Sequence, residues 1–180
     1  MAVQSNERKL AELILYISQK SADDPNFGQT KLNKILFFTD FSAYGKWGHT
    51  VTGADYQHLP NGPTVYRMLP VQRELKADDS LAVQPVNYWG FNQNKPVNLR
   101  EPDLNIFTGP EIALVDLWID RLRSLTAAEV SKMSHNTAAW KTTEDGEMIN
   151  PATVFISWGE PTAAEIRRGQ EIAAHSDLLA

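Results

Sequence analysis

The segment from Thr30 to Tyr44 constrains the fold more than any other part of the sequence. Its apolar residues fall on two helical stripes, formed by Leu32, Ile35, Leu36 and Ala43 and by Phe37, Phe41 and Tyr44. A helix that is apolar on nearly every side beyond its first turn belongs inside a fold rather than on its surface. The pattern therefore predicts a central buried helix over 30–44, which ends at Gly45 and is packed by several other helices.

Three charged residues interrupt this apolar helix. An unpaired carboxylate among apolar side chains is costly, so we expect Asp40 either to face solvent or to bond a buried partner such as Tyr56, His135 or a backbone amide. A catalytic carboxylate is the third option. Lys31 and Lys34 lie in the first turns, where positive charge opposes the helix macrodipole. We interpret these lysines as solvated charges, with contact to an acidic partner as the functional alternative.

Further helices are predicted around the central one. An amphipathic helix begins after Ser5 or Asn6 and stops by 22–26. Another covers 64–76 with Pro63 as its first residue, and Pro70 inside it predicts a kink or a new start. Thr-x-x-Glu capping boxes mark helix starts at Thr108, Thr126 and Thr162, and Asn136 is a candidate cap for a further short helix.

The β structure is expected to be small. Residues 55–58 have a strand-like pattern, and residues 81–99 contain strand-like runs with a hairpin tip at 92–95. Pro85 and Pro96 cannot donate to a β ladder, so these strands should be short or at an edge. Residues 154–156 fit either a strand or a helix. Together the patterns predict an α+β fold, predominantly α-helical, with a small antiparallel sheet or hairpin.

Size and charge narrow the class of protein. The 180 residues fit a single domain, and the chain has no cysteine. Residues 1–90 hold nine basic and nine acidic side chains, whereas residues 91–180 hold eight and thirteen. An acidic half argues against a nucleic-acid partner and suits either a basic protein surface or simple solubility. Because no apolar run reaches the roughly 20 residues that span a bilayer and the start lacks a signal-peptide core, we predict a cytoplasmic protein without a membrane partner.

Motifs of catalysis are scarce. The sequence contains no P-loop, dinucleotide-binding glycine motif, nucleophile elbow or zinc-protease motif. His49, Asp55 and His58 could converge on a metal, but their spacing matches no standard ligand pattern and solvated or hydrogen-bonded histidines are commoner. Ser134 beside His135 allows a nucleophile–base interpretation. We favour instead a half-buried His135 that hydrogen-bonds at a helix junction and locks it beside Trp140. We therefore predict no metal, no cofactor and no enzymatic activity.

Three segments, in order, resemble a known family. Residues 30–41 resemble the Lys-Leu-x-Lys-Leu-Leu-Tyr-Phe-x-Asp helix of SocA-like, or Panacea, domains. Residues 51–63 are similar to that family's Thr-Gly-x-x-Tyr…Gly-Pro segment, and residues 134–140 to its Ser-His-x-x-x-x-Trp element. The resemblance covers about 7–142, which leaves 143–180 as a divergent helical tail. The matching positions, which we interpret as mostly structural, are Lys31, Leu32, Lys34, Asp40, Gly53, Tyr56, Gly62, Pro63, His135 and Trp140.

The resemblance implies a bacterial or phage-associated antitoxin that binds a protein toxin, typically encoded by the adjacent gene. One branch of the family acts as a proteolytic adaptor, which delivers its toxin to a protease. A phage-associated interaction protein without a toxin is the alternative function. A hydrolase that uses Asp40, Tyr56 and His135 is the third possibility, and it requires these residues to meet in one open pocket.

Overall fold

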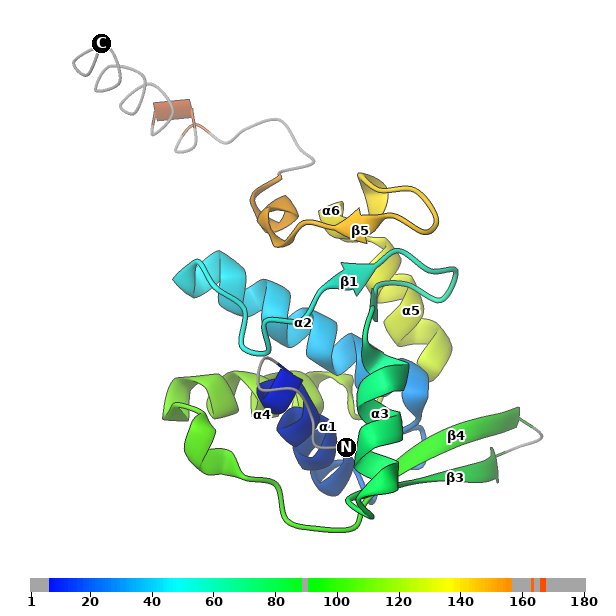
Figure 1. Cartoon of the computed structure of the whole chain (residues 1–180). Helices are drawn as coiled ribbons and strands as arrows, with labels where there is room; N and C mark the ends of the chain where they lie inside the picture. The colour runs from blue at the N-terminus through cyan, green and yellow to red at the C-terminus, as the bar shows by residue number, and fades with distance from the viewer. Residues whose placement is uncertain (1–6, 89–90, 157–162, 164–165, 168–180) are drawn as a thin grey trace.

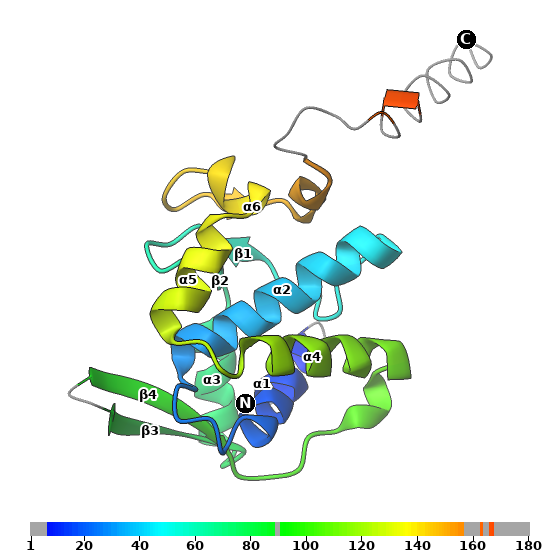
Figure 2. The same cartoon turned by 180° about the vertical axis from the view of Figure 1, so that it is seen from behind.

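The computed structural model describes residues 7–88, 91–156, 163, 166 and 167 of the chain. A helix through the middle organises the fold: α2, Gln29–Trp47, contacts α1, Arg8–Lys20, and α4, Gly109–Leu122, on one side (Figures 1 and 2). It also contacts α5, Ala127–His135. This arrangement confirms the predicted central helix and the predominantly helical α+β class.

The central helix is longer than predicted, because Gly45 does not end it. The helix continues to Trp47 and is closed by Gly48, which adopts a left-handed φ of 77°. A Cβ placed on Gly45 would lie 3.4 Å from Cγ2 of Val154. Gly45 therefore lies against Val154 of a later segment, a tertiary contact that the local sequence does not reveal.

Two capping boxes begin helices as predicted. Thr108 precedes α4 and Thr126 precedes α5, and each accepts a hydrogen bond from the backbone of a glutamate that bonds back to it. The third box, at Thr162, lies outside the described residues. The short helix α6, Ala138–Lys141, is capped by Thr137 and not by Asn136, which is one residue too early.

The helix predicted over 64–76 starts later. Thr64–Val65 forms strand β2, and α3 runs Met68–Ala77. Pro70 is thus the third residue of α3, where its missing N–H has no helical acceptor to lose. Of the two outcomes that Pro70 predicted, the new start is correct. Residues 151–155 form the 3₁₀ helix η3, Pro151–Phe155, which decides the ambiguous segment at 154–156 in favour of a helix up to Phe155.

Two small antiparallel sheets complete the fold, together with the 3₁₀ helix η2, Leu104–Ile106. In the first sheet β1, Tyr56–Gln57, lies between β2 and β5, Met148–Ile149. The pairing of Tyr56 in β1 with Ile149 in β5 therefore joins two segments that lie about 90 residues apart in the sequence. The sheet lies across α2 from α1, beside α5 and α6 (Figure 1).

The second sheet is a hairpin that extends from the body of the molecule (Figure 1). Strand β3, Leu81–Tyr88, pairs with β4, Phe91–Asn98, so that Tyr88 lies opposite Phe91. The predicted tip at 92–95 is therefore wrong, and these residues belong to β4. Pro85 and Pro96 both occur in a two-stranded ribbon, where every strand has an open edge, as expected for residues that cannot donate to a ladder.

Candidate functional site

Asp40 is the centre of a buried hydrogen-bond cluster between α2 and the loop that leads to β1. Its Oδ1 accepts from the backbone N–H groups of Val51, at 2.8 Å, and Thr52, at 2.9 Å. Its Oδ2 accepts from the Thr52 hydroxyl and, at 2.8 Å, from the Tyr56 hydroxyl. Of the environments predicted for Asp40, the structure has the buried one, with Tyr56 and backbone amides as partners. His135 is not among these partners.

Burial and hydrogen bonding act in opposite directions on Asp40. Burial raises the pKa of this carboxyl above its ordinary value, while the hydrogen bonds from Thr52, Tyr56 and Val51 oppose the rise. Burial and the neighbouring carboxylate also raise the pKa of Tyr56 well above its ordinary value, so Tyr56 stays a neutral donor. The cluster fixes the loop 51–56 to the central helix. Nearby Gly53 makes the turn with a left-handed φ of 70°.

Lys31 is buried in an ion pair, which contradicts both interpretations of this lysine from the sequence. Its Nζ lies 2.7 Å from Oδ2 of Asp24, and it donates a second bond to the carbonyl oxygen of Arg123 at 3.1 Å. The side chains of Lys31 and Asp24 are 1% and 3% exposed. The lysine therefore ties the loop before α2 to the end of α4. Its acidic partner is inside the chain, two residues after the predicted end of the first helix.

Lys34 is buried as well, but no carboxylate faces it. Its Nζ donates to the carbonyl oxygen of Pro63 at 2.8 Å. Burial lowers the pKa of Lys34 to about 7. Gly62 makes this arrangement possible, because it has a φ of 99° and a Cβ there would lie 2.7 Å from Cε of Lys34 and closer still to the Ser134 hydroxyl. The Gly62-Pro63 turn is thus held between α2 and α5.

Two histidines enclose Trp140. The ring of His135 stacks on Trp140 at a centroid distance of 4.1 Å, and the ring of His58 stacks on it at 3.3 Å. Nδ1 of His58 lies 2.9 Å from the Thr143 hydroxyl. Burial, with the positive charge of Lys34, lowers the pKa of His135. His135 does lie half-buried beside Trp140, as predicted, but ring stacking holds it there. Its Nε2 has no hydrogen-bond partner among the described residues.

The residues of the hydrolase hypothesis do not form one open site. Asp40 and Tyr56 are in contact, but both are buried, and no described contact joins either to His135. The hydroxyl of Ser134 donates to the backbone carbonyl of Ser131 rather than to His135. In the described part of the chain, no three His, Asp or Glu side chains are grouped so that they could hold a metal ion. His49 is exposed and lies next to the carbonyl of Thr50.

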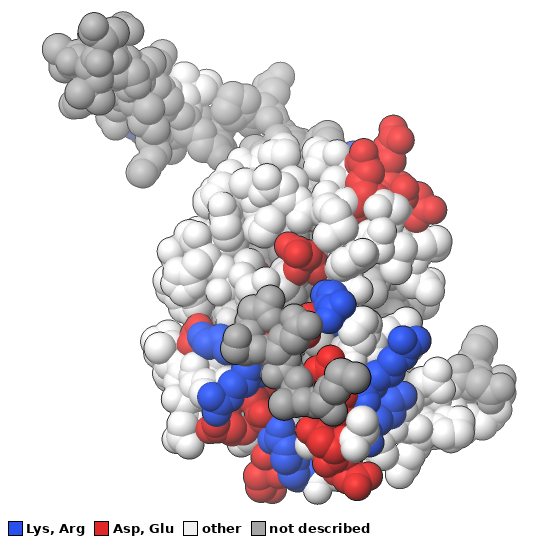
Figure 3. Space-filling view, in the orientation of Figure 1, with Lys and Arg blue, Asp and Glu red and all other residues white. Residues whose placement is uncertain are grey.

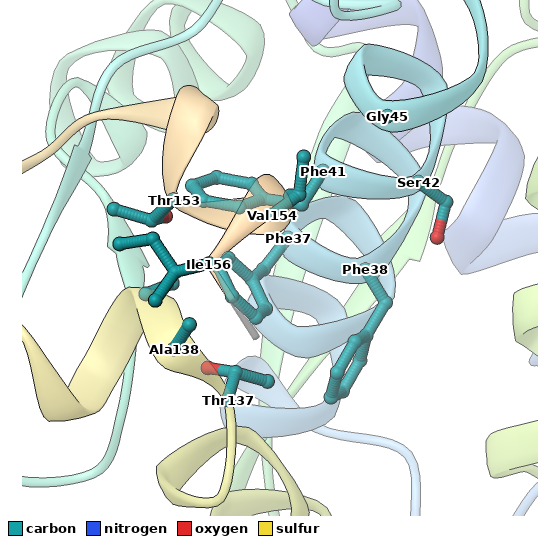
Figure 4. Close-up of a pocket in the computed structure, with 11 residues that line it drawn as sticks. Phe37, Phe38, Phe41, Ser42, Gly45, Thr137, Ala138, Thr153, Val154 and Ile156 are labelled. Atoms are coloured by element: carbon teal, nitrogen blue, oxygen red, sulfur yellow. The ribbon is translucent and has the colours of Figure 1, made fainter. Parts of the chain in front are cut away.

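An apolar pocket of about 350 Å³ opens beside the central helix. Phe37, Phe38 and Phe41 of α2 form one wall, and Val154 and Ile156 approach from the opposite side (Figure 4). The start of α6 closes a third side with small residues such as Ala138. Phe38 also stacks on Trp118 of α4, with 4.7 Å between the ring centres. The pocket offers apolar contact area and few polar groups, which suits an apolar side chain better than a polar metabolite.

The last described elements expose apolar side chains next to acidic ones. Met148, Phe155 and Ile156 are 49%, 65% and 44% exposed. Glu144, Asp145 and Glu147 lie in the loop just before β5, and Figure 3 shows acidic side chains gathered at this end of the molecule. We call residues 142–156 the cap segment. It contains three acidic residues and no lysine or arginine.

Comparison with family models identifies the chain. The model of the antitoxin SocA-like, Panacea domain matches residues 32–141, which is more than half of the sequence. The chain therefore belongs to this family. The match contains every predicted motif residue except Lys31, which directly precedes it. Comparison with curated proteins and with solved structures gave no significant match. No helix among the described residues is long and apolar enough to cross a membrane.

Several residues of these clusters were missed at the sequence level. Asp24 was interpreted only as part of a turn and Thr52 only as a member of a family segment, while Ser134 was considered as a nucleophile rather than as a neighbour of the Gly62 turn. His58 was considered as a metal ligand, whereas it packs on Trp140. The local sequence carries no signal for these contacts, because each one joins residues from different elements. The pocket was missed for the same reason, since its walls come from α2, α6 and η3.

Proposed function

We propose that the chain is an antitoxin of a type II toxin–antitoxin system, which neutralises a protein toxin by binding it directly in the cytoplasm. Membership of the antitoxin SocA-like family is the observation that carries this proposal. The toxin is the product of the adjacent gene. Its surface is complementary to an antitoxin with a net charge of −5, of which the whole excess lies in residues 91–180.

The environment of the ionisable motif residues supports a binding protein rather than an enzyme. Asp40 is fully buried and accepts four hydrogen bonds from its own chain. Lys31 and Lys34 are each 1% exposed and are engaged by Asp24 and by the Pro63 carbonyl. A general acid or base must come within hydrogen-bond reach of a substrate, and groups that are held in this way hold the fold together instead.

The test is co-expression with the neighbouring gene under separate inducible promoters. We expect the neighbouring gene alone to arrest growth, simultaneous induction of the antitoxin to restore it, and the two proteins to co-purify through a tag on either one. A size-matched unrelated domain, expressed to the same level, is the control and should not restore growth. Persistent arrest with both proteins soluble would count decisively against toxin neutralisation.

The same cells separate direct inhibition from delivery to a protease. Under direct binding, the amount of toxin measured by immunoblot stays constant or rises while growth recovers. A proteolytic adaptor would instead lower the toxin level, and rescue would then disappear in cells that lack the protease. A fall in toxin that tracks the rescue would therefore replace the direct mechanism by the adaptor mechanism.

A further inference from the structure

The cap segment 142–156 exposes several bulky apolar side chains over a short stretch of the sequence. Three bulky apolar residues are at least 44% exposed within nine positions, namely Met148, Phe155 and Ile156. Phe155 is the most exposed of the large apolar residues that the structure describes, and its ring lies 6.1 Å from the ring of Tyr44. Bulky apolar side chains that cluster on a surface mark interaction sites.

The same segment has an uncompensated negative charge. None of the ion pairs between described residues involves Glu144, Asp145 or Glu147. Lys141 immediately precedes the segment, and the stretch 141–156 still carries a net charge of −2. A segment that carries both carboxylates and exposed apolar residues favours a partner that presents both basic and apolar residues, because complementary potentials guide association and exclude wrong partners.

The cap segment also lies outside the part of the chain that defines the family. The family match ends at residue 141. One wall of the apolar pocket, with Phe37, Phe38 and Phe41, belongs to the matched range, whereas the opposite wall, with Val154 and Ile156, belongs to the cap segment (Figure 4). The pocket is therefore part family framework and part feature of this chain. A surface that selects one toxin need not belong to the framework that the family shares, and the cap segment lies beyond the matched range.

We propose that the cap segment 142–156 is the surface that selects the toxin, an inference that rests on the proposed antitoxin function. Its partner is a basic toxin segment with a bulky apolar side chain. That side chain packs against Phe155 and against Ile156, which lines the pocket, while Lys or Arg residues of the same toxin segment face Glu144 and Asp145. Aromatic residues with large contact areas tend to dominate the binding energy of such interfaces.

Binding of the purified antitoxin to the purified product of the neighbouring gene tests this proposal. We expect Phe155→Ser with Ile156→Ser to weaken the Kd at least tenfold. Glu144→Lys with Asp145→Lys should slow association, and this effect should shrink as salt is raised from 50 to 500 mM, as for charges on an exposed surface (about 14 Å and 4 Å Debye lengths). The first pair of substitutions removes apolar contact area and the second reverses charge, so the two pairs test the surface independently.

Matched control variants lie outside the cap segment. Tyr66→Ser with Leu69→Ser removes apolar side chains that are 57% and 63% exposed. Asp55→Lys with Asp120→Lys reverses two exposed carboxylates outside the cap segment. We expect both controls to bind the toxin within twofold of the parent chain. Circular dichroism and thermal unfolding should be unchanged in all four variants, which separates a binding defect from a folding defect.

Three outcomes would overturn the proposal. Cap variants that bind the toxin as tightly as the parent chain would show that the toxin contacts another face, while the antitoxin function itself stood. A parent chain that neither binds nor neutralises the neighbouring product would remove the proposed function first, and the inference with it. A dimer in sedimentation velocity that becomes a monomer on Phe155→Ser would assign the surface to a second copy of this chain.

Discussion

Charged side chains are buried in the interior around α2, whereas apolar side chains are exposed on the cap segment. In the interior, Lys31, Lys34 and Asp40 are at most 1% exposed, inside a helix of mostly apolar residues. On the cap segment, Phe155 and Ile156 are left at the surface. Burying charge is costly unless it is paired, so the interior charges persist because they fix particular contacts. The apolar residues of the cap segment make few contacts in the described chain, such as that of Phe155 with Tyr44, and their exposed faces are available to a partner.

The two buried lysines sharpen this comparison within the interior itself. Lys31 meets a carboxylate, whereas Lys34 meets only the carbonyl of Pro63. Burial lowers the pKa of Lys34 to about 7, so this amine can lose its charge near neutral pH. A buried amine can thus be accommodated either by pairing its charge or by losing it. Interior substitutions should accordingly change stability, and cap substitutions should change binding alone.

The largest expected effect comes from breaking the buried ion pair. Lys31→Met leaves the carboxylate of Asp24 buried with only the backbone N–H of Asn26 as a donor. Removing one member of such a pair typically lowers the free energy of unfolding by about 3–5 kcal/mol, measured here by urea denaturation. The double variant Lys31→Met with Asp24→Leu should recover a large part of this loss. A loss below about 1 kcal/mol for the single variant would mean that the pair is not buried as described.

A smaller loss is expected from Tyr56→Phe, which removes one of the four hydrogen bonds to Asp40 and keeps the aromatic packing. Hydrogen bonds to charged groups contribute about 1.5–3 kcal/mol, and the free energy of unfolding should fall by that amount. Tyr66→Phe, at an exposed tyrosine, serves as the control and should be neutral. Equal stability of Tyr56→Phe and the parent would show that the cluster around Asp40 does not hold the loop.

The titration of Lys34 predicts a pH-dependent difference between the parent and Lys34→Met. The pKa of Lys34 is about 7 when folded and about 10.5 when unfolded, so between these values the unfolded state binds more protons. The parent should therefore gain stability relative to Lys34→Met as pH rises from 7 to 10, by up to about 1.4 kcal/mol per pH unit. Below pH 7 the difference should become constant.

Urea unfolding at pH 6, 7, 8 and 9, followed by tryptophan fluorescence, measures this difference. Groups that do not interact with Lys34 cancel, because they are common to both proteins, whereas His135, whose pKa is lowered by burial and by the charge of Lys34, can add a difference of its own at pH 6. Lys132→Met, on the exposed face of α5, is the matched control and should run parallel to the parent at every pH. A difference that does not change with pH would contradict a buried amine that is neutral above pH 7.

The smallest stability effect is expected on the cap segment. Phe155→Ser removes a side chain that is 65% exposed, and such surface substitutions usually change the free energy of unfolding by less than about 0.5 kcal/mol. The thermal midpoint should stay within a few degrees of the parent, although toxin binding is weakened. A loss of unfolding free energy above about 2 kcal/mol would show that Phe155 helps to hold the fold together, and would contradict its assignment to the binding surface alone.

Sequence patterns predicted much of the secondary structure and little of the site. The amphipathic repeat of α1 and the capping boxes at Thr108 and Thr126 depend on residues three or four positions apart, and these predictions were confirmed. The end of α2, the start of α3 and the hairpin tip were misplaced. In the first of these, Gly48 rather than Gly45 adopts the left-handed conformation that closes the helix.

The sequence by itself determined that the chain has a buried central helix, capped neighbours and the residue order of its family, because these depend on local periodicity and short-range hydrogen bonds. Only the tertiary structure decided that Lys31 and Lys34 are inside, that the histidines stack on Trp140 and that the cap segment builds one wall of a pocket. The physical reason is distance along the chain. Lys31 reaches the carbonyl of Arg123 across 92 positions, and the burial of a charge depends on such contacts rather than on its sequence neighbours.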